Sequence, residues 1–501
     1  MRQPLCTRAQ ARAHANAQAH ARRAESLRQL EKLLDQRRFL LIPNELLPHC
    51  EAVPLGVMVR GIMESLLDSE ALGKLLQEHA PEQYTRELAI DALVGLLIQV
   101  SAGHRASVFA AYTADQAATT PTISTSYQAL YGKLGRMDPK LSEAIVRFCA
   151  EKLRPVLEKL PRANEPILPG YQTKVLDGNV LTGTDHRLTA LRQWLNACLP
   201  GKSLVILEPD LGLISDLVLC EDAYTQERAL LSYILDRVQA KDLLVFDRNF
   251  STTGFAFGIA ERDGFFVGRQ HRTNLPVKVV SKLVKCGRTE TGQVYEQRVQ
   301  ATDPNTGETM LLRRIEVRLF EKTRDGDQII GLFTNLPDTV SAVAIAEIYR
   351  KRWTIETQFQ FLTGSLHCEV PGLGKPKAAL FAFAMSLVAS NALAVVRGSI
   401  RAAHGKEAEA EVSGYYLADE IGAQYRTLTK YLPAEKWEGW RTLGAKEMAS
   451  LLTEIARQVN MAELLRNQRG PKKPPATKPV YNKKHKHFST HRLMKEAEDP
   501  C

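Results

Sequence analysis

Lys174-Val-Leu-Asp-Gly-Asn179 and Leu243-Leu-Val-Phe-Asp-Arg-Asn-Phe250 are two stretches in which a short apolar run leads into an aspartate. The apolar residues predict buried strands, and each strand would carry one carboxylate, Asp177 or Asp247, to the edge of a sheet. A single aspartate after a strand is commonly only a turn or helix-cap residue. An acid at the end of a buried strand, however, needs a cation or hydrogen-bond donors. The two stretches together predict an α/β core with chemistry at its strand ends.

A third stretch, Tyr349-Arg-Lys-Arg-Trp-Thr-Ile-Glu356, supplies another carboxylate among basic residues. Its spacing predicts that Tyr349, Arg352 and Glu356 share one face of a helix. Three carboxylates, those of Asp177, Asp247 and Glu356, are the hard oxygen donors that Mg²⁺ or Mn²⁺ prefers. A plainer interpretation is that Arg352 and Glu356 form an ordinary i,i+4 salt bridge on a helix surface.

The composition of the chain sets limits on its class. The chain has 501 residues, which is too long for one core, and a formal net charge of +10, which favours a polyanionic partner. Its eight cysteines form no Cys-x-x-Cys pair, so we expect neither a zinc site nor a disulfide framework, and scattered thiols fit a reducing cytoplasm. Residues 1–38 contain no apolar signal core. The uncharged run Ala378–Val396 is interpreted as a buried helix, and a membrane span is not expected.

The periodicity along the chain predicts several further elements. Helical patterns occur at Arg8–Arg38, Arg86–Val100, Leu141–Leu160, His186–Leu199, Thr225–Val238, Ser251–Asp263, 376–400, 412–430 and 446–466. Short strands are expected at 173–181, 203–207, 213–219, 243–246 and 265–269. Alternating stretches between residues 271 and 337, broken by hairpin-type turns, predict a β-rich insertion. Between Arg466 and Lys495 there are ten Lys or Arg residues and no acid, so this tail is expected to be extended and solvated.

The three stretches resemble, in this order, the motifs of DDE transposases of the insertion-sequence-four group. That group has a strand ending D-G or D-S, a D-R-x-F box and a Y-x2-R-x3-E-x6-K signature. Asp177-Gly178 is similar to the first motif and Asp247-Arg-Asn-Phe250 to the second, while Tyr349, Arg352 and Glu356 are similar to the third. The resemblance spans about residues 170 to 400.

The resemblance implies an α/β fold with a ribonuclease H-like core and a β-rich insertion, flanked by helical N- and C-terminal regions. The implied division is a helical DNA-binding region at 1–165, the first part of the core at 166–270, the insertion at 271–337, the second part of the core at 338–400, a helical region at 401–465 and a basic flexible tail at 466–501. Asp177, Asp247 and Glu356 are implied to be catalytic and to bind the metal, with two Mg²⁺ or Mn²⁺ ions. The residues implied to contact DNA are Arg248, Tyr349, Lys351 and Arg352.

This sequence departs from the group in two places. The signature lysine is replaced by Thr363, for which Lys375 or Lys377 could substitute. The insertion contains no tryptophan that could stack a flipped base. Tyr295, Phe320 or Phe333 could stack instead, although packing in the strands is the simpler role for them. His186 is interpreted as a residue of a helix's first turn and not as a ligand.

We therefore expect a cytoplasmic, nucleoid-associated bacterial DNA transposase of the cut-and-paste type. By resemblance, its partners would be the terminal inverted repeats of its own element and target DNA, bound by a homodimer in a synaptic complex, with no membrane. Two alternatives stay open. One is a ribonuclease H-like nuclease that cleaves DNA without joining it, and the other is an inactive DNA-binding relic.

Overall fold

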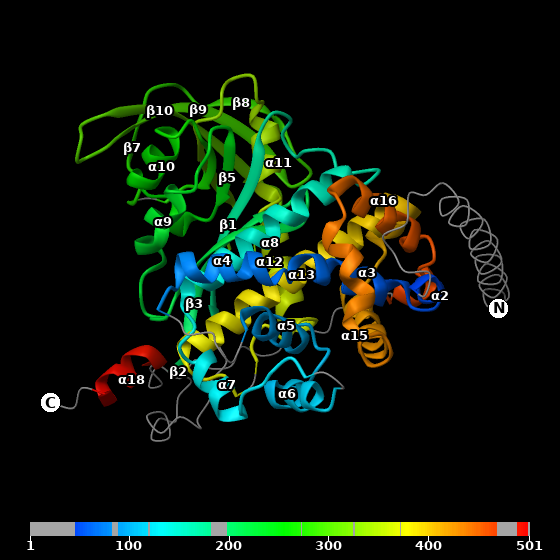
Figure 1. Ribbon diagram of the computed structural model, residues 1–501. Coiled ribbons are helices and arrows are strands. Elements are labelled where there is room, and N and C mark those ends of the chain that lie inside the picture. Colours follow the sequence, from blue (N-terminus) through cyan, green and yellow to red (C-terminus); the bar gives the residue numbers. More distant parts are fainter. Residues whose placement is uncertain are drawn as a thin grey trace, which may run out of the picture. The chain divides into compact units, whose positions relative to one another are not determined.

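The computed structural model describes residues 46–82, 89–118, 121–181, 198–271, 273–323, 326–370, 372–467 and 488–498 (Figure 1). The predicted helix Arg8–Arg38 and His186 lie outside the described residues. The chain divides into two compact units. The first contains residues 1–163, 361–370 and 382–486, and the second contains residues 164–360, 371–381 and 487–501.

The first unit is helical and joins the N-terminal helices to those near the C-terminus. Its helices are α2 (Leu47–Ala52), α3 (Pro54–Leu66), α4 (Ser69–His79), α5 (Ile90–Ser101), α6 (Val108–Gln116), α7 (Tyr127–Leu134), α8 (Pro139–Lys159), α14 (Lys406–Ala410), α15 (Gly414–Tyr431), η5 (Ala434–Thr442), α16 (Ala445–Ala456) and α17 (Met461–Leu464). Helix α3 is central because it contacts α15, η5 and α16. Its Gly61 lies against the buried ring of Trp440, where a Cβ would come within 2.2 Å of a ring atom. Close helix packing therefore requires glycine at that position.

Helix α13 (Pro376–His404) contains the long uncharged run of the sequence. It is long and apolar enough to cross a membrane, but 89% of its most apolar window is buried inside the protein. The polar side chains along it are accommodated in the interior, and the hydroxyl of Ser386 donates to the carbonyl of Phe383 at 2.6 Å. The expectation of a buried helix agrees with this burial.

The second unit is built on a ten-stranded sheet in the order β4-β3-β1-β5-β6-β11-β10-β9-β7, with β8 also paired to β9. The strands are β1 (Gln172–Leu181), β3 (Gly201–Glu208), β4 (Leu213–Cys220), β5 (Asp242–Phe246), β6 (Phe265–Arg269), β7 (Val277–Val279), β8 (Val284–Arg288), β9 (Gly292–Thr302), β10 (Thr309–Leu319) and β11 (Ile329–Thr334). The pairs β1–β5 and β5–β6 are parallel, and the other pairs are antiparallel. The strands of residues 277–334 continue the central sheet, because β11 pairs with β6. The second unit is therefore a mixed α/β structure.

The two faces of the central strands carry different side chains. Leu176, Phe246 and Phe266 belong to a buried cluster that also contains Phe255 of helix α10 (Thr253–Ala260). Because side chains alternate along a strand, Val245 and the residues in phase with it point to the opposite face. Helix α11 (Ala342–Arg350) contacts β5, β6 and the strands β8 to β10.

The prediction of one long helix at Thr225–Val238 is wrong, because the helical segment is shorter. The structure has a 3₁₀ turn, η3 (Glu227–Leu230), followed by the short helix α9 (Leu231–Leu235). The helix stops early because the backbone N–H of Gln239 donates to the Asp242 carboxylate at 2.8 Å, which closes a turn before β5. The helix expected at Ser251–Asp263 is α10, which is shorter than predicted.

The C-terminal tail also differs from the expectation where it is described. Residues 488–489 form strand β12, which pairs in parallel with β2 (Cys198–Leu199), and residues Thr490–Glu498 form helix α18. This pairing also replaces the end of the helix expected at His186–Leu199. The tail packs here because Leu493 is buried and Arg492 pairs with Asp222 at 2.8 Å. A high charge alone therefore did not keep this segment in solvent.

Candidate active site

The register between two parallel strands brings Asp177 and Asp247 together. The β1–β5 ladder ends at the pair Leu176↔Phe246, so the two aspartates are the next residues on neighbouring strands. Side chains alternate between the two faces of a strand, so Asp177 and Asp247 point away from the face of Leu176 and Phe246. That face carries the buried cluster with Phe255 and Phe266, here called the aromatic cluster. Strand β1 itself continues to Leu181 through its pairing with β3. Asp177 therefore lies at the end of one ladder, although the sequence predicted it at the end of the strand.

The segment from Tyr349 to Glu356 is not the single helix that its spacing predicted. Helix α11 ends at Arg350, residues 351 and 352 form a turn, and helix α12 (Trp353–Gly364) begins after it. The backbone hydrogen bonds here span three residues, as in a 3₁₀ turn, and the N–H of Arg352 donates to the carbonyl of Tyr349 at 3.0 Å. Glu356 lies in the first turn of α12, where the helix N-terminus favours a negative charge.

Arg352 links two of the three expected carboxylates. Its Nη1 donates to Oδ2 of Asp177 at 3.2 Å, and its Nη2 donates to Oε1 of Glu356 at 2.7 Å. Arg352 is only 9% exposed. The i,i+4 pair with Glu356 is therefore part of a partly buried network, and the interpretation as a surface salt bridge is wrong.

The electrostatics of the site show that its acids interact. Burial raises the pKa of Asp177 to about 6. The Arg352 cation and the N–H of Gly178 oppose this shift, while the like charges of Asp247 and Glu356 add to it. The Arg352 cation therefore does not fully offset the cost of ionising Asp177 at this position.

Tyr349 is buried beside these charges. It is 8% exposed, and burial raises the pKa of its hydroxyl against the opposing effect of Arg352. The hydroxyl lies near Arg352 but has no hydrogen-bond partner in good geometry among the residues that the structure describes. A buried donor without a partner is costly, so this hydroxyl is available to a ligand.

The other residues expected to contact DNA lie at the rim. Arg248 and Lys351 are both exposed, and the backbone N–H of Arg248 donates to Oδ1 of Asp247 at 2.5 Å. Of the two candidates to replace the signature lysine, Lys375 is exposed and Lys377 lies 3.9 Å from Glu221. The Thr363 side chain lies outside the described residues.

The aromatic residues proposed for base stacking differ in accessibility. Phe333 is fully buried in the aromatic cluster, so it cannot stack on a base. Phe320 is 56% exposed, and Tyr295 has the Arg318 guanidinium 4.3 Å from its ring centroid. Of the three, Phe320 alone presents an open face.

A ready-made metal site is absent from the described part of the chain, where no three His, Cys, Asp or Glu side chains converge closely enough to hold an ion. Around Asp177 the reason is visible, because the Arg352 guanidinium joins its carboxylate to that of Glu356. The donor chemistry nonetheless fits a hard cation, since the carboxylates of Asp247 and Glu356 lie near enough to Asp177 to act on its charge.

One acidic residue near the site was not anticipated from the sequence. Oε2 of Glu227 accepts a hydrogen bond from Nδ2 of Asn249 at 2.7 Å. The same carboxylate lies where a Cβ of Gly178 would be, with Oε1 2.4 Å from that position. In the sequence, only Gly178 indicates that another group comes close to the backbone beside Asp177. A glycine does not identify that group, so Glu227 could not be predicted.

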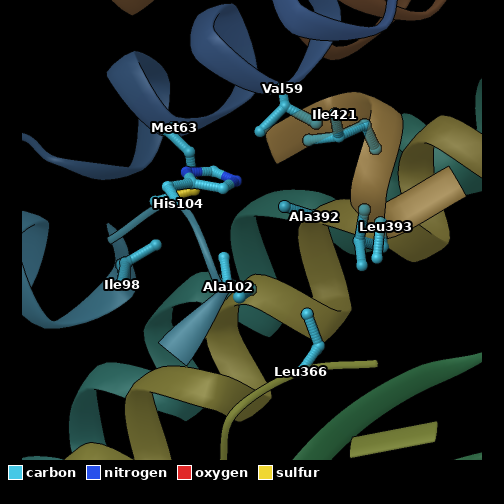
Figure 2. A pocket seen from close by; sticks show the side chains of 11 residues that line it. Val59, Met63, Ile98, Ala102, His104, Leu366, Ala392, Leu393 and Ile421 are labelled. Carbon is cyan, nitrogen blue, oxygen red and sulfur yellow. The ribbon is translucent and has the colours of Figure 1, made fainter. Parts of the chain in front are cut away.

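A cavity in the first unit provides a contrast with this site (Figure 2). It measures about 20 Å³ and is lined by apolar side chains and His104. Both ring nitrogens of His104 lack hydrogen-bond partners among the described residues, and burial together with the cations of Arg426 and Arg105 lowers its pKa to about 3. With no second polar group in its lining, the cavity has the character of a core defect and not of a catalytic site.

The family comparison concerns mainly the second unit of the chain. Residues 179–390, less than half of the chain, match the family model of the transposase DDE domain. This segment includes Asp247 and Glu356 and begins two residues after Asp177. A search of curated proteins gave no match.

Among solved structures, a cryo-EM structure of a piggyBac transposase synaptic complex with hairpin DNA is similar at a TM-score of 0.37 and 11% sequence identity. The similarity covers 83% of this chain and 87% of that chain. A TM-score of this size is too low to carry an argument about fold or function. The family match over residues 179–390 supports a DDE-type transposase domain in this chain.

Proposed function

We propose that this chain is a DNA transposase of the insertion-sequence-four group with a ribonuclease H-like catalytic core. It cleaves the ends of its own element and joins the freed 3′-hydroxyls to target DNA. The observation that carries the proposal is the placement of Asp177 and Asp247 one step beyond the Leu176↔Phe246 pair, with Arg352 linking Asp177 to Glu356. The family match over residues 179–390 supports it independently.

In this proposal the core consists of residues 166–270 and 338–400, interrupted by the β-rich insertion at 271–337. The helical regions at 1–165 and 401–465 and the tail at 466–501 bind DNA or support the core. The protein acts in the cytoplasm as a homodimer that bridges two element ends. The net charge of +10 favours the polyanionic partner that this arrangement needs.

The three acids Asp177, Asp247 and Glu356 are proposed to hold Mg²⁺ or Mn²⁺. Their oxygen donors suit these ions, which, when bound, activate an attacking oxygen and stabilise the leaving oxygen of a phosphoryl transfer. Burial above all, with smaller contributions from Asp247 and Glu356, raises the pKa of Asp177, so its ionised form is held at a cost. Cost of this kind is typical of groups kept for function.

Arg352 is proposed to have two roles. Without an added cation it neutralises part of the charge of Asp177 and Glu356 through the bonds described above. Its planar guanidinium is also suited to a DNA phosphate, and the hydroxyl of Tyr349 beside it can donate to the same group. The exposed Arg248 and Lys351 extend the phosphate-binding rim.

The experiment is a strand-transfer assay with pre-cleaved element ends, a plasmid target and Mg²⁺. The wild type is expected to join ends to the plasmid, and Asp247→Asn is expected to abolish joining while DNA binding persists. The matched control is Glu308→Gln, an exposed acid of the β9–β10 hairpin, which should leave joining unchanged. The ends themselves come from the DNA flanking the gene, where inverted repeats are expected.

The two alternatives predict other outcomes of the same assay. A ribonuclease H-like nuclease would nick DNA with Mg²⁺ but never join the ends, and an inactive relic would bind DNA and do neither. Either result with the wild-type protein overturns the proposal.

A further inference from the structure

Glu227 lies behind the site, on the other face of the sheet. Gly178 follows Asp177 in β1 and is in phase with Leu176, so it points to the face of the aromatic cluster. There the Glu227 carboxylate fills the space beside it, with Cδ 2.7 Å and Oε1 2.4 Å from the position of a Cβ on residue 178. Real Cβ atoms do not approach other atoms so closely, so a side chain at 178 would displace the Glu227 carboxylate from its present position.

The same carboxylate also holds the segment after Asp247. Asn249 lies in the 3₁₀ turn η4 (Arg248–Phe250), for which Asp247 is the N-cap residue. Its Nδ2 donates to Oε2 of Glu227 at 2.7 Å, across 22 residues of sequence.

One side chain therefore lies against Gly178, which follows Asp177, and bonds the side chain of Asn249, which lies two residues after Asp247. Asp177 pairs with Val205 of β3, whereas Asp247 lies beyond the last pair of β5, so the β1–β5 ladder does not fix the placement of one aspartate relative to the other. Glu227 is well placed to do so, because it begins the 3₁₀ turn η3 and is itself only partly exposed.

We infer that Glu227 is a positioning residue, which packs against Gly178 and holds the Asn249 side chain and so sets the relative placement of Asp177 and Asp247. It acts through its shape and its hydrogen bond, from the face opposite to the acids, and not as a metal ligand. The inference rests on the proposed function in that the two aspartates are taken to hold a divalent cation. It also gives a reason for Gly178 and Asn249 in motifs where only the acids had been assigned a role.

The test compares full-length Glu227→Ala, Glu227→Gln, Asn249→Ala and the double variant Glu227→Ala/Asn249→Ala. Mn²⁺ binding is measured by electron paramagnetic resonance without DNA, alongside thermal unfolding and Mn²⁺-dependent nicking. We expect both single alanine variants to weaken Mn²⁺ binding by about three- to tenfold, the effect of one hydrogen bond on geometry. The double variant should be no weaker than either single one.

Glu227→Gln distinguishes positioning from a direct role of the charge. Its Oε1 can still accept from Asn249, so we expect binding and nicking within about twofold of the wild type. A Gln variant as impaired as Ala overturns the inference, because the charge would then be what matters. An Ala variant that binds Mn²⁺ like the wild type overturns it as well.

Gly178→Ala provides an independent check of the packing. The added methyl should displace Glu227 and impair Mn²⁺ binding, while Gly178→Ala/Glu227→Ala should bind as Glu227→Ala does, since the space is then free. If the losses of Mn²⁺ affinity from the two substitutions add up in that double variant, the positioning role of Glu227 is contradicted. Glu308→Gln is again the matched control.

These outcomes separate the positioning role of Glu227 from the proposed function. A wild-type protein that binds Mn²⁺ but never cuts DNA removes the transposase proposal and leaves the positioning role intact. A wild-type protein that binds no Mn²⁺ overturns the metal site. In that case thermal unfolding still tests the contact between Glu227 and Asn249. If the double alanine variant loses as much stability as the two single variants together, the contact is contradicted.

Discussion

The acidic site and the His104 cavity both bury a group that can ionise, and burial favours the neutral form of each, but the neighbours of the two groups differ. Asp177 has other acids and a cation around it, and its pKa is raised to about 6. His104 has apolar walls and two nearby arginines, and its pKa is lowered to about 3. In the cavity every contribution favours the neutral form of His104, whereas at the site the Arg352 cation lowers the cost of a charge on Asp177. The difference teaches that burial alone does not mark a functional residue, and that converging charges do.

The largest expected effect comes from Asp177→Asn, which removes one acid of the site. Strand transfer should fall on the order of 10³-fold or more, since a group acting on the reacting atoms is lost. Stability should move the other way. The folded-state pKa of about 6 lies above the reference value of 3.8, so wild-type stability decreases as pH rises between these values and stays reduced above them. At neutral pH the variant should gain on the order of 2 kcal/mol, measured by denaturant unfolding. If Asp177→Asn is both inactive and less stable than the wild type, Asp177 is not held at a cost to stability, and the contrast with the cavity fails.

The next largest effect concerns His104→Phe in the cavity. The folded-state pKa of about 3 lies below the reference value of 6.5, so stability is fully present above pH 6.5 and is lost as the pH falls towards 3. Replacement by Phe keeps a ring against Tyr425, which is stacked at 4.4 Å, and removes this loss. At pH 4 the variant should be more stable than the wild type by on the order of 3 kcal/mol, with unchanged strand transfer at neutral pH. Parallel stability curves for the two proteins between pH 6.5 and 4 would contradict the assignment.

A smaller effect is expected from Arg352→Ala, which removes the cation from the acidic site. Three carboxylates would then face one another, and the free energy of unfolding should fall by about 1–2 kcal/mol after allowance for solvent screening. Millimolar Mg²⁺ should restore part of this loss in the variant. Arg350→Ala is the matched control, because Arg350 pairs with Glu290 and Glu347 at an exposed position, and its effect should stay within about 0.5 kcal/mol. Equal losses in both variants would show that Arg352 is an ordinary surface cation.

The smallest effect on stability is expected from Tyr349→Phe. Within the described ranges the hydroxyl has no hydrogen-bond partner in good geometry, so its removal should change the free energy of unfolding by less than about 1 kcal/mol. Binding of an element-end duplex, measured by fluorescence anisotropy, should nonetheless weaken about three- to tenfold through the loss of one phosphate contact. Unchanged affinity would exclude the hydroxyl from the DNA-binding rim.

The sequence predicted the central strands well because their signals are local. Continuous apolar runs of β-branched and aromatic residues mark β1, β5 and β6, and turn residues mark the hairpin of β9 and β10. The proximity of Asp177 and Asp247 followed from the expectation that neighbouring strands place their acids at one edge.

Other features depend on contacts that no local pattern contains. The break between α11 and α12 has no proline or glycine to signal it, and α9 is cut short by the turn that Asp242 closes. The pairing of β12 with β2 joins residues nearly three hundred positions apart. Glu227 was missed for the same reason, since its partners are distant in sequence and each contacts it through a single group.

Iron-directed cleavage of the protein tests the central claim most directly, namely that Asp177, Asp247 and Glu356 hold one divalent-cation site. Fe²⁺ replaces Mg²⁺, and ascorbate with peroxide then cuts the polypeptide next to the bound iron. We predict fragments from cuts near these three residues, suppressed by excess Mg²⁺ and absent in Asp247→Asn. Cuts confined to other segments, or a pattern unchanged by that substitution, would contradict the account.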